Sequence, residues 1–132
     1  MRAVLAILLG ALVAVIVIWL MTGVAHLFYP GSFAVAALAG PGEFADPLSQ
    51  VPLRAKATLV IGWFLGALAG AGTTNIATGQ GYMGWVVAGL VVLYGLLLSI
   101  LYPHPTWMAL CAVVLPLLAG YVARKATNVK LR

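Results

Sequence analysis

Four long apolar runs occupy most of this 132-residue chain, and they constrain its fold more than any other feature. A helix needs roughly 20 apolar residues to cross the hydrocarbon core of a bilayer. Inside lipid every backbone polar group must be paired, which favours helices over irregular structure. We therefore predict an all-α integral membrane bundle, one domain over residues 1–132, with four transmembrane helices at residues 3–28, 53–78, 82–102 and 106–123.

The composition indicates the same environment, because 64% of the residues are hydrophobic and only 7% are charged. A soluble domain is about a quarter charged.

The first run follows Arg2 and ends near Gly23-Val24-Ala25, a pattern that a secretory signal sequence with its cleavage site also shows. Its apolar stretch, from Ala3 to about Met21, exceeds the ~7–15 residues of a signal core, so we expect this helix to be retained.

Residues 29–52 form the longest connection, and they contain the only acidic residues, Glu43 and Asp46. Within this connection Ser32 to Leu38 is predicted to form a short surface helix. Ser32 is suited to cap its start, and Gly40-Pro41 is suited to end it. We expect this loop on the outer side of the membrane.

The seven basic residues predict the orientation. Cytoplasmic ends of transmembrane helices carry an excess of Lys and Arg. Two cations follow the 29–52 loop, and five lie at the chain ends: Arg54 and Lys56, against Arg2, Arg124, Lys125, Lys130 and Arg132. We expect both termini in the cytoplasm and the tail from residue 124 onward to be frayed. Because the cations mark helix ends, the net charge of +5 predicts membrane lipid and no nucleic acid as a partner.

Three glycines in the second run, Gly62, Gly66 and Gly70, recur every four residues and share one helix face. Such a glycine zipper lets a second helix approach closely. The pattern has two interpretations. The face packs internally against the first or fourth run, or it mediates self-association as a homo-oligomer or within a larger membrane complex. We expect the first two runs to pack as a hairpin along it.

Four polar residues map to the predicted outer rim: His26, Glu43, Asp46 and His104. Imidazoles and carboxylates are metal ligands, but the chain lacks the close His or Cys spacings of metal sites. We predict no metal and no other cofactor. His26 is suited to bond near the end of the first helix, and His104 to order the turn between Pro103 and Pro105.

The predicted spans contain no ionisable acid or base, although proton-coupled transporters usually need one at depth. The small multidrug exporters have four helices and a similar length but depend on a glutamate in their first helix, so that class is disfavoured. The polar residues at depth are Thr22, Thr58, Thr73, Thr74, Asn75, Tyr94 and Ser99. Hydroxyls in helices usually bond to carbonyls of the preceding turn, which favours a structural role.

Several motifs together resemble a family of small, uncharacterised bacterial four-helix membrane proteins. They are Gly23-x-x-His26-x-x-Tyr29-Pro30, Val51-Pro52, Gly62-Trp63-x-Leu65-Gly66-Ala67 and Pro103-His104-Pro105-x-Trp107. The resemblance implies four spans and a bacterial inner membrane, and it implies no activity. The family often carries an acid shortly before the first motif, whereas this chain reads Trp19-Leu20-Met21-Thr22. The resemblance therefore implies no ionisable site in the first span.

These patterns favour a non-enzymatic accessory or scaffolding subunit that binds a partner through the glycine face or the outer loop. The alternative is a small transporter or channel acting as an oligomer. A continuous wet cavity lined by Thr22, Asn75, Tyr94 and Ser99 would favour transport, whereas scattered, internally bonded groups would favour the accessory role. An enzyme would require the four rim residues to converge.

Overall fold

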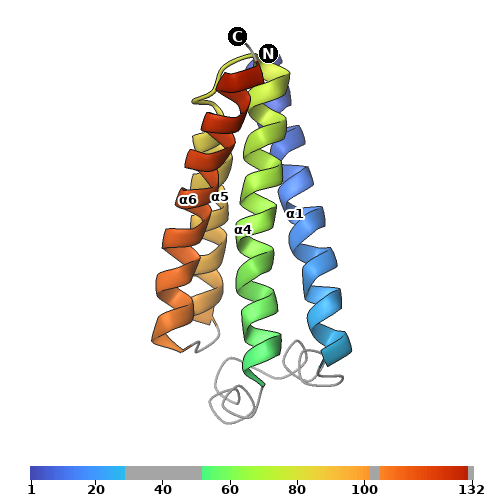
Figure 1. Ribbon diagram of the computed structural model, residues 1–132, viewed down its shortest axis with the longest axis vertical. Coiled ribbons are helices and arrows are strands. Elements are labelled where there is room, and N and C mark those ends of the chain that lie inside the picture. Colours follow the sequence, from blue (N-terminus) through green and yellow to red (C-terminus); the bar gives the residue numbers. More distant parts are fainter. Residues whose placement is uncertain (29–51, 102–104, 131–132) are drawn as a thin grey trace.

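The computed structural model describes residues 1–28, 52–101 and 105–130. Four helices make up this part: α1 (Arg2–Phe28), α4 (Leu53–Thr78), α5 (Gly84–Leu101) and α6 (Thr106–Lys130) (Figure 1). Each is long and apolar enough to cross a membrane, and the described segments contain no strand. The predicted all-α, four-helix fold is confirmed. The start of α1 and the end of α6 lie at the same end of the bundle (Figure 1).

The observed helices begin and end close to the predicted positions, except at the end of α6. We expected fraying from Arg124, but the helix continues to Lys130. The expectation was wrong because Thr127 is buried and hydrogen-bonded to another helix, which holds the last turns in place. The predicted surface helix at residues 32–38 falls outside the described residues.

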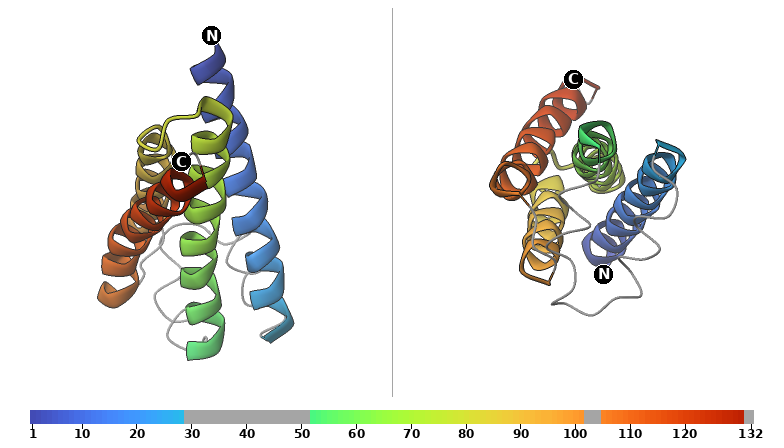
Figure 2. Two further views of the ribbon diagram at one scale, coloured as in Figure 1. Left: turned by 45° about the horizontal axis from the view of Figure 1, so that its top comes forward. Right: turned by 90° about the horizontal axis from the view of Figure 1, so that it is seen from below.

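Helix α4 is the centre of the bundle, since it packs against α1, α5 and α6. Its span is 44% buried, against 22% for α1, which presents most of its surface outward. Helices α1 and α5 both lie beside α4 but contact each other little, and they diverge toward the Phe28 end of α1 (Figure 2). The result is an arrangement that is open on the side between α1 and α5.

The core consists mainly of small side chains around α4. Glycine and alanine let helices approach until their backbones nearly touch, which favours association where lipid offers no hydrophobic gain. A few larger side chains complete the core, among them Ile18, Trp63, Val87 and Met108. Pro116 lies inside α6 and is fully buried there.

Candidate functional site

The glycine face of α4 lies against α1. A Cβ added to Gly66 would be 2.6 Å from Ile18 Cγ1, and one added to Gly62 would be 2.8 Å from Met21 Cβ. A Cβ on Gly70 would be 2.5 Å from the carbonyl oxygen of Gly10. Because α1 already occupies this face, the glycines are not available to a second protein in this arrangement.

A hydroxyl reinforces the same contact near the end of the bundle where α1 begins. Thr74 Oγ1 lies 3.2 Å from the Ala6 carbonyl oxygen of α1 and 3.0 Å from the Gly70 carbonyl oxygen of its own helix. Gly10 leaves room for this side chain, since a Cβ there would overlap Thr74 Oγ1. The hydroxyl is fully buried, so its bonding ties α1 to α4 away from water.

Asn75 joins α4 to α5 and α6. Its Oδ1 accepts a hydrogen bond from the Gly84 backbone N–H at 2.7 Å, and its Nδ2 donates to Thr127 Oγ1 at 3.3 Å. The Thr127 hydroxyl in turn donates to the Ala123 carbonyl oxygen at 2.8 Å. Gly84 begins α5, where an amide has no acceptor within its own helix. Asn75 therefore caps α5 from α4 and fixes the end of α6.

Most of the remaining hydroxyls at depth bond within their own helices. Thr22, Thr58, Thr73 and Ser99 each donate to the carbonyl four residues earlier, all at 2.8 Å. This is the backward bonding expected of such residues. Through the described spans these groups are scattered and do not line one continuous polar path.

The predicted rim cluster is described only in part. His26 lies in the last turn of α1, is half-buried and has an interaction partner. Glu43, Asp46 and His104 lie outside the described residues. In the segments that the structure does describe, no group of three potential metal ligands comes together.

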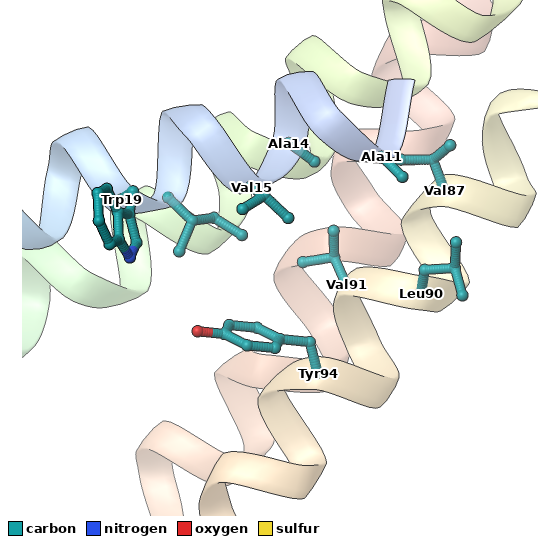
Figure 3. Close-up of a pocket in the computed structure, with 9 residues that line it drawn as sticks. Ala11, Ala14, Val15, Trp19, Val87, Leu90, Val91 and Tyr94 are labelled. Carbon is teal, nitrogen blue, oxygen red and sulfur yellow. The ribbon is translucent and has the colours of Figure 1, made fainter. Parts of the chain in front are cut away.

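A groove between α1 and α5 is a feature that the sequence did not predict. It encloses about 180 Å³ (Figure 3). Its walls are Ala11, Ala14, Val15 and Ile18 of α1 and Val87, Leu90 and Val91 of α5. Trp19 and Tyr94 complete the lining and bring its polar atoms, the indole N–H and the phenol hydroxyl (Figure 3). The sequence signal was the position of Trp19 and Tyr94 well inside apolar runs rather than at their ends.

The groove has no charged lining residue, so it suits an apolar molecule. The buried polar groups elsewhere are engaged in holding the helices together. Comparison of the chain with protein-family models, with curated proteins and with solved structures returns no match. The functional interpretation therefore depends on the geometry of these sites.

Proposed function

We propose that this chain is a non-enzymatic accessory or scaffolding component of a bacterial inner membrane, with both termini in the cytoplasm. The observation that carries the proposal is the bonding of the polar side chains at depth. Asn75 and Thr74 bond between helices, and Thr22 and Ser99 bond within them. Groups that are engaged in this way stabilise a bundle and do not provide a hydrated route for a solute.

The packing also indicates which surface is available to a partner. Helix α1 covers the glycine face of α4, so we place the partner-binding surface elsewhere on the bundle. The lipid-facing side of α1 is the largest candidate, because only 22% of that span is buried within the chain. A component that recognises other membrane molecules needs such an accessible face.

Two measurements on the same protein test the proposal. The tagged chain is purified from bacterial membranes in mild detergent, and its co-purifying proteins and total mass are determined. We expect a defined complex that is larger than the single chain. The purified chain is also reconstituted into liposomes loaded with ions and small fluorescent solutes, where we expect leakage equal to that of protein-free liposomes.

The alternative, a small oligomeric transporter or channel, predicts a complex of identical chains and solute release above that of protein-free liposomes. A homo-oligomer that releases a solute several times faster than empty liposomes would overturn the accessory proposal. As a control, Gly72→Ala replaces a glycine whose added Cβ would meet nothing within 4 Å. This variant should give the wild-type result in both measurements. That result would exclude a general effect of altering α4.

A further inference from the structure

We propose that the groove between α1 and α5 binds a lipid-soluble molecule with one linear apolar chain and a carbonyl oxygen. This inference goes beyond the accessory role and is independent of it, because the site lies within one copy of the chain. Four properties of the groove support it: a fixed floor, a small volume, two hydrogen-bond donors at the mouth and the absence of charge.

The floor of the groove is held in place by the rest of the bundle. Ala14, Ile18, Val87 and Val91 line it and are at most 7% exposed. A Cβ on Gly70 would lie 2.9 Å from both the Ala14 Cβ and the Val87 Cγ1, so α4 backs the groove directly. A floor packed in this way is formed before any ligand arrives, which reduces the ordering cost of binding.

The volume favours a single hydrocarbon chain over a helix. A helix is about 10–12 Å wide and rises 5.4 Å per turn, so one turn with its side chains fills roughly 400–600 Å³. The groove encloses about 180 Å³. Typical pockets for drug-sized ligands begin at about 300 Å³. A narrow chain therefore fits along the floor, whereas a partner helix would contact only the mouth.

Two hydrogen-bond donors, the Trp19 indole N–H and the Tyr94 hydroxyl, lie at the open side of the groove. Figure 3 shows the Tyr94 hydroxyl extending from α5 toward the α1 side, with the Trp19 ring on the opposite wall. Tyr94 is seven residues from Leu101, the nearer end of α5, which is about 10 Å at 1.5 Å per residue. Trp19 is nine residues, or about 14 Å, from Phe28, the end of α1. Both donors thus lie at hydrocarbon depth rather than in the interfacial belts where these residues are usually found.

Neither donor has a hydrogen-bond partner among the residues of the described helices. Trp19 is 80% exposed and Tyr94 43% exposed to the surroundings of the bundle. An unpaired donor in hydrocarbon is unfavourable. An indole N–H only donates, and a phenol hydroxyl donates readily, so the complementary group is an acceptor oxygen. With no cation in the lining, a neutral carbonyl fits better than a phosphate or carboxylate.

Binding of decyl-1,4-benzoquinone to the full-length protein in detergent tests the proposal, with decylbenzene as the probe that keeps the chain and lacks the oxygens. Quenching of tryptophan fluorescence and the shift of the melting temperature are recorded against probe concentration. We expect saturable quenching and a saturable rise of the melting temperature with the quinone. Decylbenzene should raise the melting temperature only at distinctly higher concentration.

Matched variants locate the site. Tyr94→Phe removes only the hydroxyl, and we expect it to weaken quinone binding about fivefold, the effect of one ordinary hydrogen bond. Tyr82→Phe removes the hydroxyl of an exposed tyrosine outside the groove and should change nothing. Ala11→Leu fills the groove and should abolish saturation, whereas Ala109→Leu alters an alanine on α6 that is also partly buried and should not.

Three results would overturn the proposal. Quenching that grows in proportion to the quinone without saturating would indicate partition into the micelle. Equal effects of Tyr94→Phe and Tyr82→Phe would remove the hydroxyl from the site. A stable dimer of the purified protein that shields Trp19 and excludes both probes would assign the groove to a second copy. Circular dichroism of each variant confirms that it has folded before binding is compared.

Discussion

Glycines control the most extensive contact among the described helices, which is between α1 and α4. Where lipid surrounds a protein, apolar side chains gain little by leaving it, so van der Waals contact and hydrogen bonds favour association. Gly10 and Gly70 face each other across this contact, and the Thr74 hydroxyl fits beside them. A methyl group added here meets backbone atoms, which cannot rotate away as a side chain can.

Gly70→Ala is therefore expected to destabilise the protein by about 1–3 kcal/mol, the usual cost of overpacking a core. The added Cβ would be 2.5 Å from the Gly10 carbonyl oxygen and 2.9 Å from the Ala14 Cβ. Gly72→Ala is the control on the same helix, because its Cβ meets nothing within 4 Å. It should gain up to about 1 kcal/mol from helix propensity. Thermal unfolding in detergent, followed by circular dichroism, compares the two, and shifts in the same direction would contradict the packing account.

Asn75 hydrogen-bonds to two other helices, so its loss affects α4, α5 and α6 together. Asn75→Leu leaves the buried Gly84 N–H without its acceptor at 2.7 Å and Thr127 without its donor. An unsatisfied buried group costs about 1–3 kcal/mol. We expect a loss of that size in the free energy of unfolding, measured by titration with denaturing detergent.

Thr73→Val is the matched control for Asn75→Leu. The Thr73 hydroxyl bonds only to the Ala69 carbonyl oxygen of its own helix, at 2.8 Å. Its loss leaves the helix ladder intact, so we expect a change below about 0.5 kcal/mol, as for substitutions away from special features. Equal destabilisation by the two variants would mean that Asn75 does not cap α5.

Among the elements, the last turns of α6 differ most from what the sequence predicted. Their basic composition predicted a frayed tail, and local composition contains no sign of a hydrogen bond to a residue 52 positions earlier. That bond, from Asn75 to Thr127, extends the ordered helix beyond the apolar run. The Lys125 ammonium also lies 5.7 Å from the centre of the Tyr121 ring, a cation–π contact within the same turns.

Truncation after Arg124 should consequently destabilise the bundle even though it removes mostly polar residues. Truncation after Asn128 retains Thr127 and should have little effect. We expect the shorter protein to lose about as much stability as Thr127→Val, because both remove the partner of the Asn75 amide. Melting temperatures of the three variants measured in one detergent make the comparison. A wild-type melting temperature for the protein that ends at Arg124 would show that the last turns are dispensable.

The existence and approximate limits of the helices were predictable, whereas most of the contacts between them were not. Length and apolarity identify a span, and Pro52 and Gly79 mark the two ends of α4. A helix that is apolar on all sides gives no periodic signal of which face packs inward. The glycines of α4 indicated a close contact and a hairpin with the first run, and the structure places α1 against them. The groove was beyond prediction because it depends on the angle between α1 and α5, which no local pattern encodes.

For the whole molecule, the central position of α4 explains why the fold stays open on one side. Helix α4 contacts the other three helices, while α1 and α5 contact each other little. Asn75 and Thr74 bond α4 to all three neighbours near the end of the bundle where α1 begins, and the helices diverge toward the other end (Figure 2). Because the helices are hydrogen-bonded together at one end of the bundle and diverge at the other, a groove forms between α1 and α5. Trp19 and Tyr94 line this groove.

An even number of spans has a consequence for topology, since both ends of the chain must then lie on one side of the membrane. The start of α1 and the end of α6 share one end of the bundle. Five cations lie at the chain ends and two near the 29–52 loop, so we expect the shared side to be the cytoplasm. Fluorescent protein fused to either terminus should fluoresce, and alkaline phosphatase at the same positions should stay inactive. A cysteine introduced by Glu43→Cys should react with a membrane-impermeant maleimide in intact spheroplasts.

Because positive charge sets this orientation, neutralising Arg124 and Lys125 while adding two lysines to the loop should yield a mixed population in which part of the C-terminal phosphatase becomes active. Reporters that place the two termini on opposite faces would mean that one of the four helices does not cross the bilayer.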